Sequence, residues 1–87
     1  MRFKILIGKR AQRAMRQLQI SDARKIDAKI LSLASNPFPP GAIKLTEKGS
    51  VYRVRVGVLR ILYQVIKEKH IVFIDAVGHR RDIYRKK

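Results

Sequence analysis

Arginines recur at alternate positions in the second half of the chain, within runs rich in β-branched residues. Arg53 and Arg55 alternate with apolar residues in Val51–Val56, and Arg60 follows Gly57 by three positions. Alternate residues of a strand share one face of a sheet, so this spacing places Arg53 and Arg55 side by side. A guanidinium is always charged, and its planar fork of N–H donors fits a phosphate bidentately. The spacing therefore indicates an anion-binding surface built on strands.

A tight turn at Gly57-Val58 would bring the third arginine to the first two. Arg55 then pairs with Arg60, and the arginines share one face with Leu62 and Gln64. A slip of one residue would turn the apolar residues outward, so the hydrophobic pattern favours this register. The opposite face, which we expect to cover the helices, then carries the apolar set Tyr52, Val54, Val56, Leu59, Ile61, Tyr63 and Val65.

Two arginines directly opposite each other repel, so the pair requires an anion or a nearby acid. Pairing Ile66 with Ile71 across the next loop places Asp75 opposite Leu62, where it would partly neutralise the arginines. The same register places His79 on the sheet face that carries the three arginines. The alternative is that the arginines form the solvated face of a half-exposed sheet, and periodicity alone does not decide between the two.

The N-terminal half carries the pattern of one strand and two helices. Alternation of Phe3, Ile5 and Ile7 predicts a first strand, which Gly8 ends. Apolar residues at three- and four-residue spacing predict a helix over Lys9–Gln19. Ser21 is expected to cap a second helix that runs to about Ser35, where Asn36-Pro37 ends it.

The pattern then changes to a period of two. We expect a short strand over Ile43–Leu45 and long strands over Val51–Val56, Val58–Ile66 and Ile71–Val77. The expected order of elements is βααβββ with one further strand at the C-terminal end, and this order predicts an α+β fold. Both N-terminal helices would pack on one face of a twisted, mainly antiparallel sheet.

Composition narrows the class of protein. The 87 residues suffice for a single domain, residues 1–87, and carry 21 Lys and Arg against 6 Asp and Glu, a formal charge of +15. Such a domain usually meets a polyanion: RNA, DNA, a membrane surface or an acidic protein. The absence of cysteine excludes disulfides and thiolate chemistry, and two histidines argue against a metal site. The N-terminal apolar run is too short for a signal peptide or membrane span, so a cytoplasmic protein is expected.

Three segments together resemble the RelE toxins of the RelE/ParE superfamily. They are YRVRVG at Tyr52–Gly57, RILY at Arg60–Tyr63 and VGHRRDIY at Val77–Tyr84. The resemblance covers essentially the whole chain, and the expected order of elements matches that fold. It implies the toxin of a type II toxin–antitoxin module, a ribosome-dependent endoribonuclease that inhibits translation by cutting mRNA in the A site. It also implies that no metal or cofactor is used. The implied partners are a cognate acidic, RelB-like antitoxin, a 70S-type ribosome and mRNA, with DNA met only through the antitoxin complex.

The family's reaction is attack of the RNA 2′-hydroxyl on the adjacent phosphorus, which leaves a cyclic phosphate and a free 5′-hydroxyl. This chemistry needs an acceptor for the 2′ proton, positive charge on the phosphorane and a proton for the leaving oxygen. Carried onto this sequence, the resemblance implies catalytic roles for Arg55, Arg60, Arg80, Tyr84 and His79. It implies RNA-binding roles for Arg53, Arg81, Lys44 and Lys48, and Arg81 could also take the part of Arg80.

One departure from the family concerns proton transfer. Well-studied bacterial members carry lysines where this chain has Arg53 and Arg55, and arginine is a poor general acid or base. His79 is the natural replacement because imidazole exchanges protons near neutral pH; alternatively it hydrogen-bonds the backbone at a strand end. Tyr84 could stack on a base, orient the 2′-hydroxyl or take its proton, or else cap the core. His70, in a polar loop, is interpreted as a surface residue.

Two other functions fit parts of the sequence. A ParE-like toxin of the same fold would poison DNA gyrase without nuclease chemistry, although such sequences generally lack the paired basic strand residues and the terminal arginine–tyrosine set. A basic RNA-binding protein without catalysis would explain the charge equally well. New 5′-hydroxyl ends on translated mRNA would distinguish the nuclease from both.

Overall fold

The computed structural model describes residues 2–45 and 49–79. Its elements, in chain order, are β1 (Lys4–Ile7), α1 (Lys9–Arg16), α2 (Ile20–Ser35), β2 (Ile43–Lys44), β3 (Val51–Val56), β4 (Leu59–Ile66), the 3₁₀ turn η1 (Lys67–Lys69) and β5 (Ile71–His79). The strands form one sheet in the order β1-β5-β4-β3-β2, in which only the β1–β5 pair is parallel. The predicted α+β fold with a mainly antiparallel sheet is confirmed.

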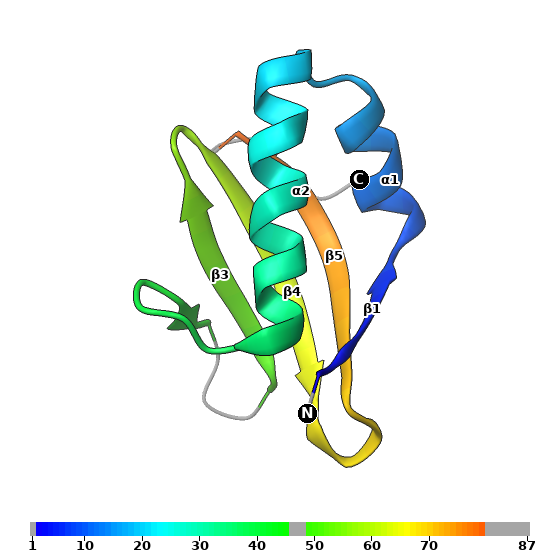
Figure 1. The fold of residues 1–87 in the computed structure, drawn as a ribbon, viewed down its shortest axis with the longest axis vertical. Coiled ribbons are helices and arrows are strands. Elements are labelled where there is room, and N and C mark those ends of the chain that lie inside the picture. The colour runs from blue at the N-terminus through cyan, green and yellow to red at the C-terminus, as the bar shows by residue number, and fades with distance from the viewer. Residues whose placement is uncertain (1, 46–48, 80–87) are drawn as a thin grey trace.

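Both helices lie on one face of this sheet (Figure 1). The buried residues Ile26, Ile30 and Leu33 of α2 and Ala11 of α1 meet the inward side chains of the sheet. The strand residues of this core are Val54, Leu59, Ile61, Tyr63, Val65, Val72, Ile74 and Val77. Phe3, Ile5 and Ile7 pack against the same core, as their alternation predicts. Neither helix covers the opposite face. Within the described ranges, no helix is both long and apolar enough to cross a membrane.

The β3–β4 hairpin has the predicted register. Arg55 pairs with Arg60, and Val56 pairs with Leu59. Gly57 has a φ of +62°, while Val58 does not share this left-handed conformation. That combination is typical of a type II′ turn, which requires glycine at its first central position. Val58 is therefore a turn residue, 72% exposed, and β4 begins one residue later than predicted.

The β4–β5 pair follows the predicted register only part of the way. Ile66 pairs with Ile71, as expected, and Tyr63 with Ile74, but Leu62 then pairs with Ala76. The predicted pairing of Asp75 with Leu62 is wrong, because Asp75 is the extra residue of a β-bulge.

The bulge shifts every later residue of β5 to the other face. Val77 pairs with Ile61 and is buried in the core, at 4% exposure, instead of facing solvent beside Arg60. Burial of a valine side chain favours this arrangement by about 1.5–3 kcal/mol. The bulge therefore keeps the apolar residues at both ends of β5 in the core.

The helix boundaries also differ from the predicted ones. The first helix ends at Arg16 and not at Gln19, because the chain turns there to bring the half-buried Leu18 onto the core. The residue preceding α2 is Gln19, whose extended backbone makes it the N-cap without a side-chain hydrogen bond. Ser21 lies inside the first turn, so its predicted capping role is wrong, whereas Asp22 occupies the first turn as expected.

Candidate active site on the arginine face

The three arginines of the hairpin share the sheet face that the helices leave uncovered, here called the arginine face. Arg55 is exposed, Arg53 is half-buried and Arg60 is only 9% exposed. Directly opposed residues of antiparallel strands have Cβ atoms about 4.5–5.5 Å apart. The Arg55–Arg60 pair therefore concentrates two positive charges at one point of the sheet.

Small and apolar residues surround Arg60 on this face. Leu62 and Ala76 are buried at 7% and 1% exposure and pack with Leu45. Gly78 is the partner of Arg60 on β5, so no side chain stands beside the arginine on that side. Arginine commonly buries its aliphatic stem along apolar surface of this kind. The sequence motif contained Gly78, but its place beside Arg60 could be seen only once the bulge was known.

The arginine pair has no protein counter-charge within the described part of the chain. There, the side chains of Arg55 and Arg60 form no hydrogen bond or ion pair. Asp75, expected to neutralise them, sits in the bulge and forms no ion pair with a described residue. A bound phosphate would relieve the repulsion between the two guanidinium groups, and its oxygens would accept their N–H donors.

His79 does not lie on the arginine face, so its predicted placement there is wrong. It pairs with Leu59, whose side chain belongs to the helix-covered core. There His79 is exposed and lines a pocket with Ala14, Gln17 and Leu18 of the α1 end. The physical cause is the bulge at Asp75, which reverses the facing of the last residues of β5.

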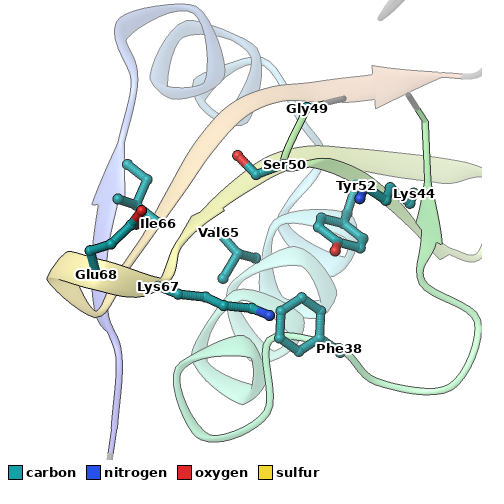
Figure 2. Close-up of a pocket in the computed structure, with 9 residues that line it drawn as sticks. All are labelled: Phe38, Lys44, Gly49, Ser50, Tyr52, Val65, Ile66, Lys67 and Glu68. Atoms are coloured by element: carbon teal, nitrogen blue, oxygen red, sulfur yellow. The ribbon is translucent and has the colours of Figure 1, made fainter. Parts of the chain in front are cut away.

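The structure also separates Lys44 from the arginines. Lys44 pairs with Tyr52 on the helix-covered side, while its neighbour Ile43 pairs with Arg53. It lines a groove with Phe38 and Tyr52 (Figure 2). The remaining predicted site residues, Lys48, Arg80, Arg81 and Tyr84, lie outside the described residues.

The two strand tyrosines belong to the core, as predicted. Tyr63 is fully buried, and its hydroxyl donates a hydrogen bond of 2.8 Å to the carbonyl oxygen of Pro37. Burial, with a smaller contribution from Tyr52, raises the pKa of Tyr63 to about 12. Tyr63 therefore stays neutral and structural. In the described ranges no three His, Asp or Glu side chains gather into a possible metal site.

Known proteins share both the sequence pattern and this arrangement of elements. The sequence model of the ParE toxin family of type II toxin–antitoxin systems (parDE) matches residues 6–84. A protein of Methanocaldococcus jannaschii named as toxin RelE1 is 33% identical over 88 residues, which cover 98% of each chain.

Two solved structures extend the likeness to the fold. RelE in the archaeal RelE–RelB complex from Pyrococcus horikoshii OT3 superposes with a TM-score of 0.83 and 25% identity, covering 94% of this chain and 99% of that one. The intact E. coli RelBE toxin–antitoxin complex gives a TM-score of 0.78 and 26% identity, covering 91% and 98%. The chain thus belongs to the RelE/ParE superfamily of type II toxin–antitoxin systems, as a RelE-like toxin.

Proposed function

We propose that this toxin is a ribosome-dependent, metal-independent endoribonuclease that cleaves mRNA in the A site and so inhibits translation in the cytoplasm. The observation that carries the proposal is the Arg55–Arg60 pair on the sheet face that the helices leave uncovered, with Gly78 as the partner of Arg60 on β5. A pair of cations placed in this way suits a phosphate that gains negative charge during a reaction.

The arginines supply the electrostatic part of the chemistry. As the RNA 2′-hydroxyl attacks phosphorus, the equatorial oxygens of the phosphorane accept N–H donors from Arg55 and Arg60. Arg53 holds a neighbouring phosphate, and the family motif assigns Arg80, with Arg81 as its neighbour, to the same RNA segment. Each donor aimed at the developing charge typically contributes about 10²–10³-fold to the rate.

Proton transfer is assigned by the family motif to Tyr84. His79 lies beside α1 on the other side of the sheet, which argues against its acting on a phosphate held by Arg55 and Arg60. We therefore expect His79→Gln to retain the wild-type cleavage rate.

Mapping of mRNA ends tests the proposal. Wild-type protein expressed in cells should create new 5′-hydroxyl ends on translated mRNA, and Arg55→Ala and Arg60→Ala should lower their number by about 100-fold or more. Arg24→Ala, which removes an exposed arginine of α2, is the matched control and should cleave normally. Wild-type levels of cut mRNA from a folded Arg60→Ala protein would overturn the assignment.

We further propose that a RelB-like acidic antitoxin silences the toxin by covering the arginine face. The solved relatives from Pyrococcus horikoshii and E. coli are complexes of RelE with RelB. An acidic segment would supply the anionic groups that the Arg55–Arg60 pair lacks among the described residues.

A second candidate function is poisoning of DNA gyrase, because the matching sequence model is that of ParE toxins. Purified toxin would then inhibit supercoiling by gyrase without creating 5′-hydroxyl ends on mRNA. The Arg55–Arg60 pair favours the nuclease, and the two assays separate the alternatives.

A further inference from the structure

A second candidate ligand site lies on the helix-covered side of the sheet, away from the arginine face. It is an open groove with a volume of about 290 Å³, between the loop that follows α2, the paired strands β2 and β3, and the turn η1 (Figure 2). That volume is at the lower end of the ~300–1,000 Å³ typical of ligand pockets, so the groove suits a small group.

The groove presents an aromatic ring to solvent. Phe38 is 40% exposed, although it packs edge to face against Tyr52 with ring centroids 5.2 Å apart. The Nζ of Lys67 lies 5.4 Å from the centroid of the Phe38 ring, and Figure 2 shows this side chain extending toward it. Lys44 lines the groove from β2, and Glu68 is the acidic residue among its lining.

The loop that carries Phe38 is held in place. The backbone N–H of Phe38 donates to Oδ1 of Asn36 at 3.1 Å, and the carbonyl oxygen of Pro37 accepts the buried Tyr63 hydroxyl. Ala42 N–H closes the loop on the carbonyl oxygen of Pro39 at 3.0 Å. Because these contacts fix the loop, the Phe38 ring stays at the surface at little entropic cost on binding.

An exposed aromatic ring in a groove that also carries lysines is one arrangement by which proteins hold single-stranded nucleic acid. The base stacks on the ring while cations contact the backbone phosphates. We propose that this groove binds one nucleotide of a single-stranded RNA, with the base stacked on Phe38 and the adjacent phosphate between Lys44 and Lys67. Lys67 then leaves the ring for the phosphate, which its flexible four-carbon stem allows.

This inference goes beyond the proposed nuclease activity and does not depend on it. The groove and the Arg55–Arg60 pair lie on opposite sides of the sheet, so one RNA phosphate cannot contact both. Binding by the groove is measured without ribosomes and without cleavage. Loss of mRNA cutting in Arg60→Ala and loss of stacking in Phe38→Ala are therefore separate results.

The absence of tryptophan allows a direct test. Phe38→Trp introduces a single tryptophan into the full chain at the expected stacking position. Titration with a six-nucleotide adenine RNA should quench its fluorescence to saturation. The same sugar–phosphate chain without bases serves as the control probe, because it carries equal charge. It should quench little, since phosphate contacts alone bring no base onto the ring.

Binding of the labelled adenine RNA to the unmodified chain and its variants completes the test. Phe38→Ala should weaken binding about 5- to 100-fold, in line with the loss of one stacked base, and should abolish the preference over the abasic chain. Lys67→Ala should weaken binding and reduce its salt dependence. Lys69 is an exposed lysine of η1 that does not line the groove. Lys69→Ala should therefore affect the binding and its salt dependence less than Lys67→Ala does.

Two results would overturn the proposal. One is equal quenching of the Phe38→Trp protein by the abasic chain and by the adenine RNA. The other is unchanged RNA binding by a folded Phe38→Ala protein, with melting temperature as the check on folding. An acidic peptide that binds the groove more tightly than RNA, in a Phe38-dependent manner, would also contradict it and would assign the groove to a protein partner.

Discussion

At the scale of single residues, Arg60 combines an unfavourable position with a proposed function. It is 9% exposed and stands directly opposite Arg55, and like charges in this position destabilise a sheet. Its neighbours on the same face are the apolar Leu62 on β4 and Gly78 on β5. Charge and packing should therefore be separable by a substitution that keeps the stem and removes the guanidinium.

Arg60→Met is that substitution. We expect it to raise the free energy of unfolding by up to about 1 kcal/mol, because the cross-strand repulsion disappears while an apolar stem remains. The same variant should lose mRNA cleavage. Urea denaturation measures the first effect, and Arg24→Met, on the exposed side of α2, should leave stability within about 0.5 kcal/mol of wild type. A less stable Arg60→Met protein would show that the guanidinium contributes to the fold.

Tyr63 predicts a loss of stability at high pH. Its pKa is raised from 10.0 to about 12 in the folded chain, so the unfolded chain loses the phenol proton first. The contribution of the neutral Tyr63 phenol to the free energy of unfolding is fully present below pH 10. It is lost as the pH rises toward 12, and the total loss is about 2–3 kcal/mol. The measurement is urea unfolding at pH 9, 10 and 11 for wild type and Tyr63→Phe. The difference between the two proteins isolates Tyr63 from the lysines, and a difference that does not change with pH would contradict the prediction.

At the scale of elements, the bulge in β5 decides which residues reach each face of the sheet. Ile74 and Val77 both enter the core although they are three positions apart, because Asp75 is the extra residue between them. A regular strand would have turned Val77 toward the arginine face. The bulge also takes His79 away from that face and leaves Gly78 beside Arg60.

Deletion of Asp75 should therefore be tolerated, which is unusual for a central strand. Ala76 would then follow Ile74 directly. Ala76 would still pair with Leu62, and Ile74 with Tyr63, in a regular ladder. We expect a folded protein that loses no more than about 2 kcal/mol, measured by thermal unfolding. Deletion of Phe73 is the matched control, and it should prevent folding because it moves residues of β5 to the wrong face. Equal damage from both deletions would show that the bulge itself is required.

At the scale of the whole molecule, the charge of +15 governs encounters with partners. Arg53, Arg55 and Arg60 place three positive charges on one sheet face, while Lys9, Arg13 and Arg16 add positive charge along α1. Such a surface accelerates association with polyanions, and salt screens that attraction.

The association rate of the toxin with its proposed acidic antitoxin should fall by about tenfold or more between 50 and 500 mM NaCl. The dissociation rate should change less, because short-range contacts dominate it. Stopped-flow mixing across a salt series measures both rates. An association rate that ignores ionic strength would place the interface on an apolar surface away from the arginines.

The sequence by itself determined the parts of this fold whose signals are local. Gly57 marks the hairpin turn, and the alternation of apolar residues on both sides of it fixes the Arg55–Arg60 pairing, because any slip would expose the core. The helical spacing of Ile26, Ile30 and Leu33 likewise places them on one face of α2, and all three are buried in the core. The candidate phosphate-binding pair could thus be predicted before the structure was known.

Only the tertiary structure decided which residues join that pair. The bulge at Asp75 has no local signal, because it depends on which register buries Val77, and that requires the facing strand. His79 was misplaced for this reason, and Gly78 was overlooked. The groove at Phe38 likewise brings together the α2–β2 loop, β3 and η1, which lie far apart along the chain. Packing of the α2–β2 loop on the sheet, through the Tyr63–Pro37 hydrogen bond, is what sets Phe38 beside Tyr52 and Lys67.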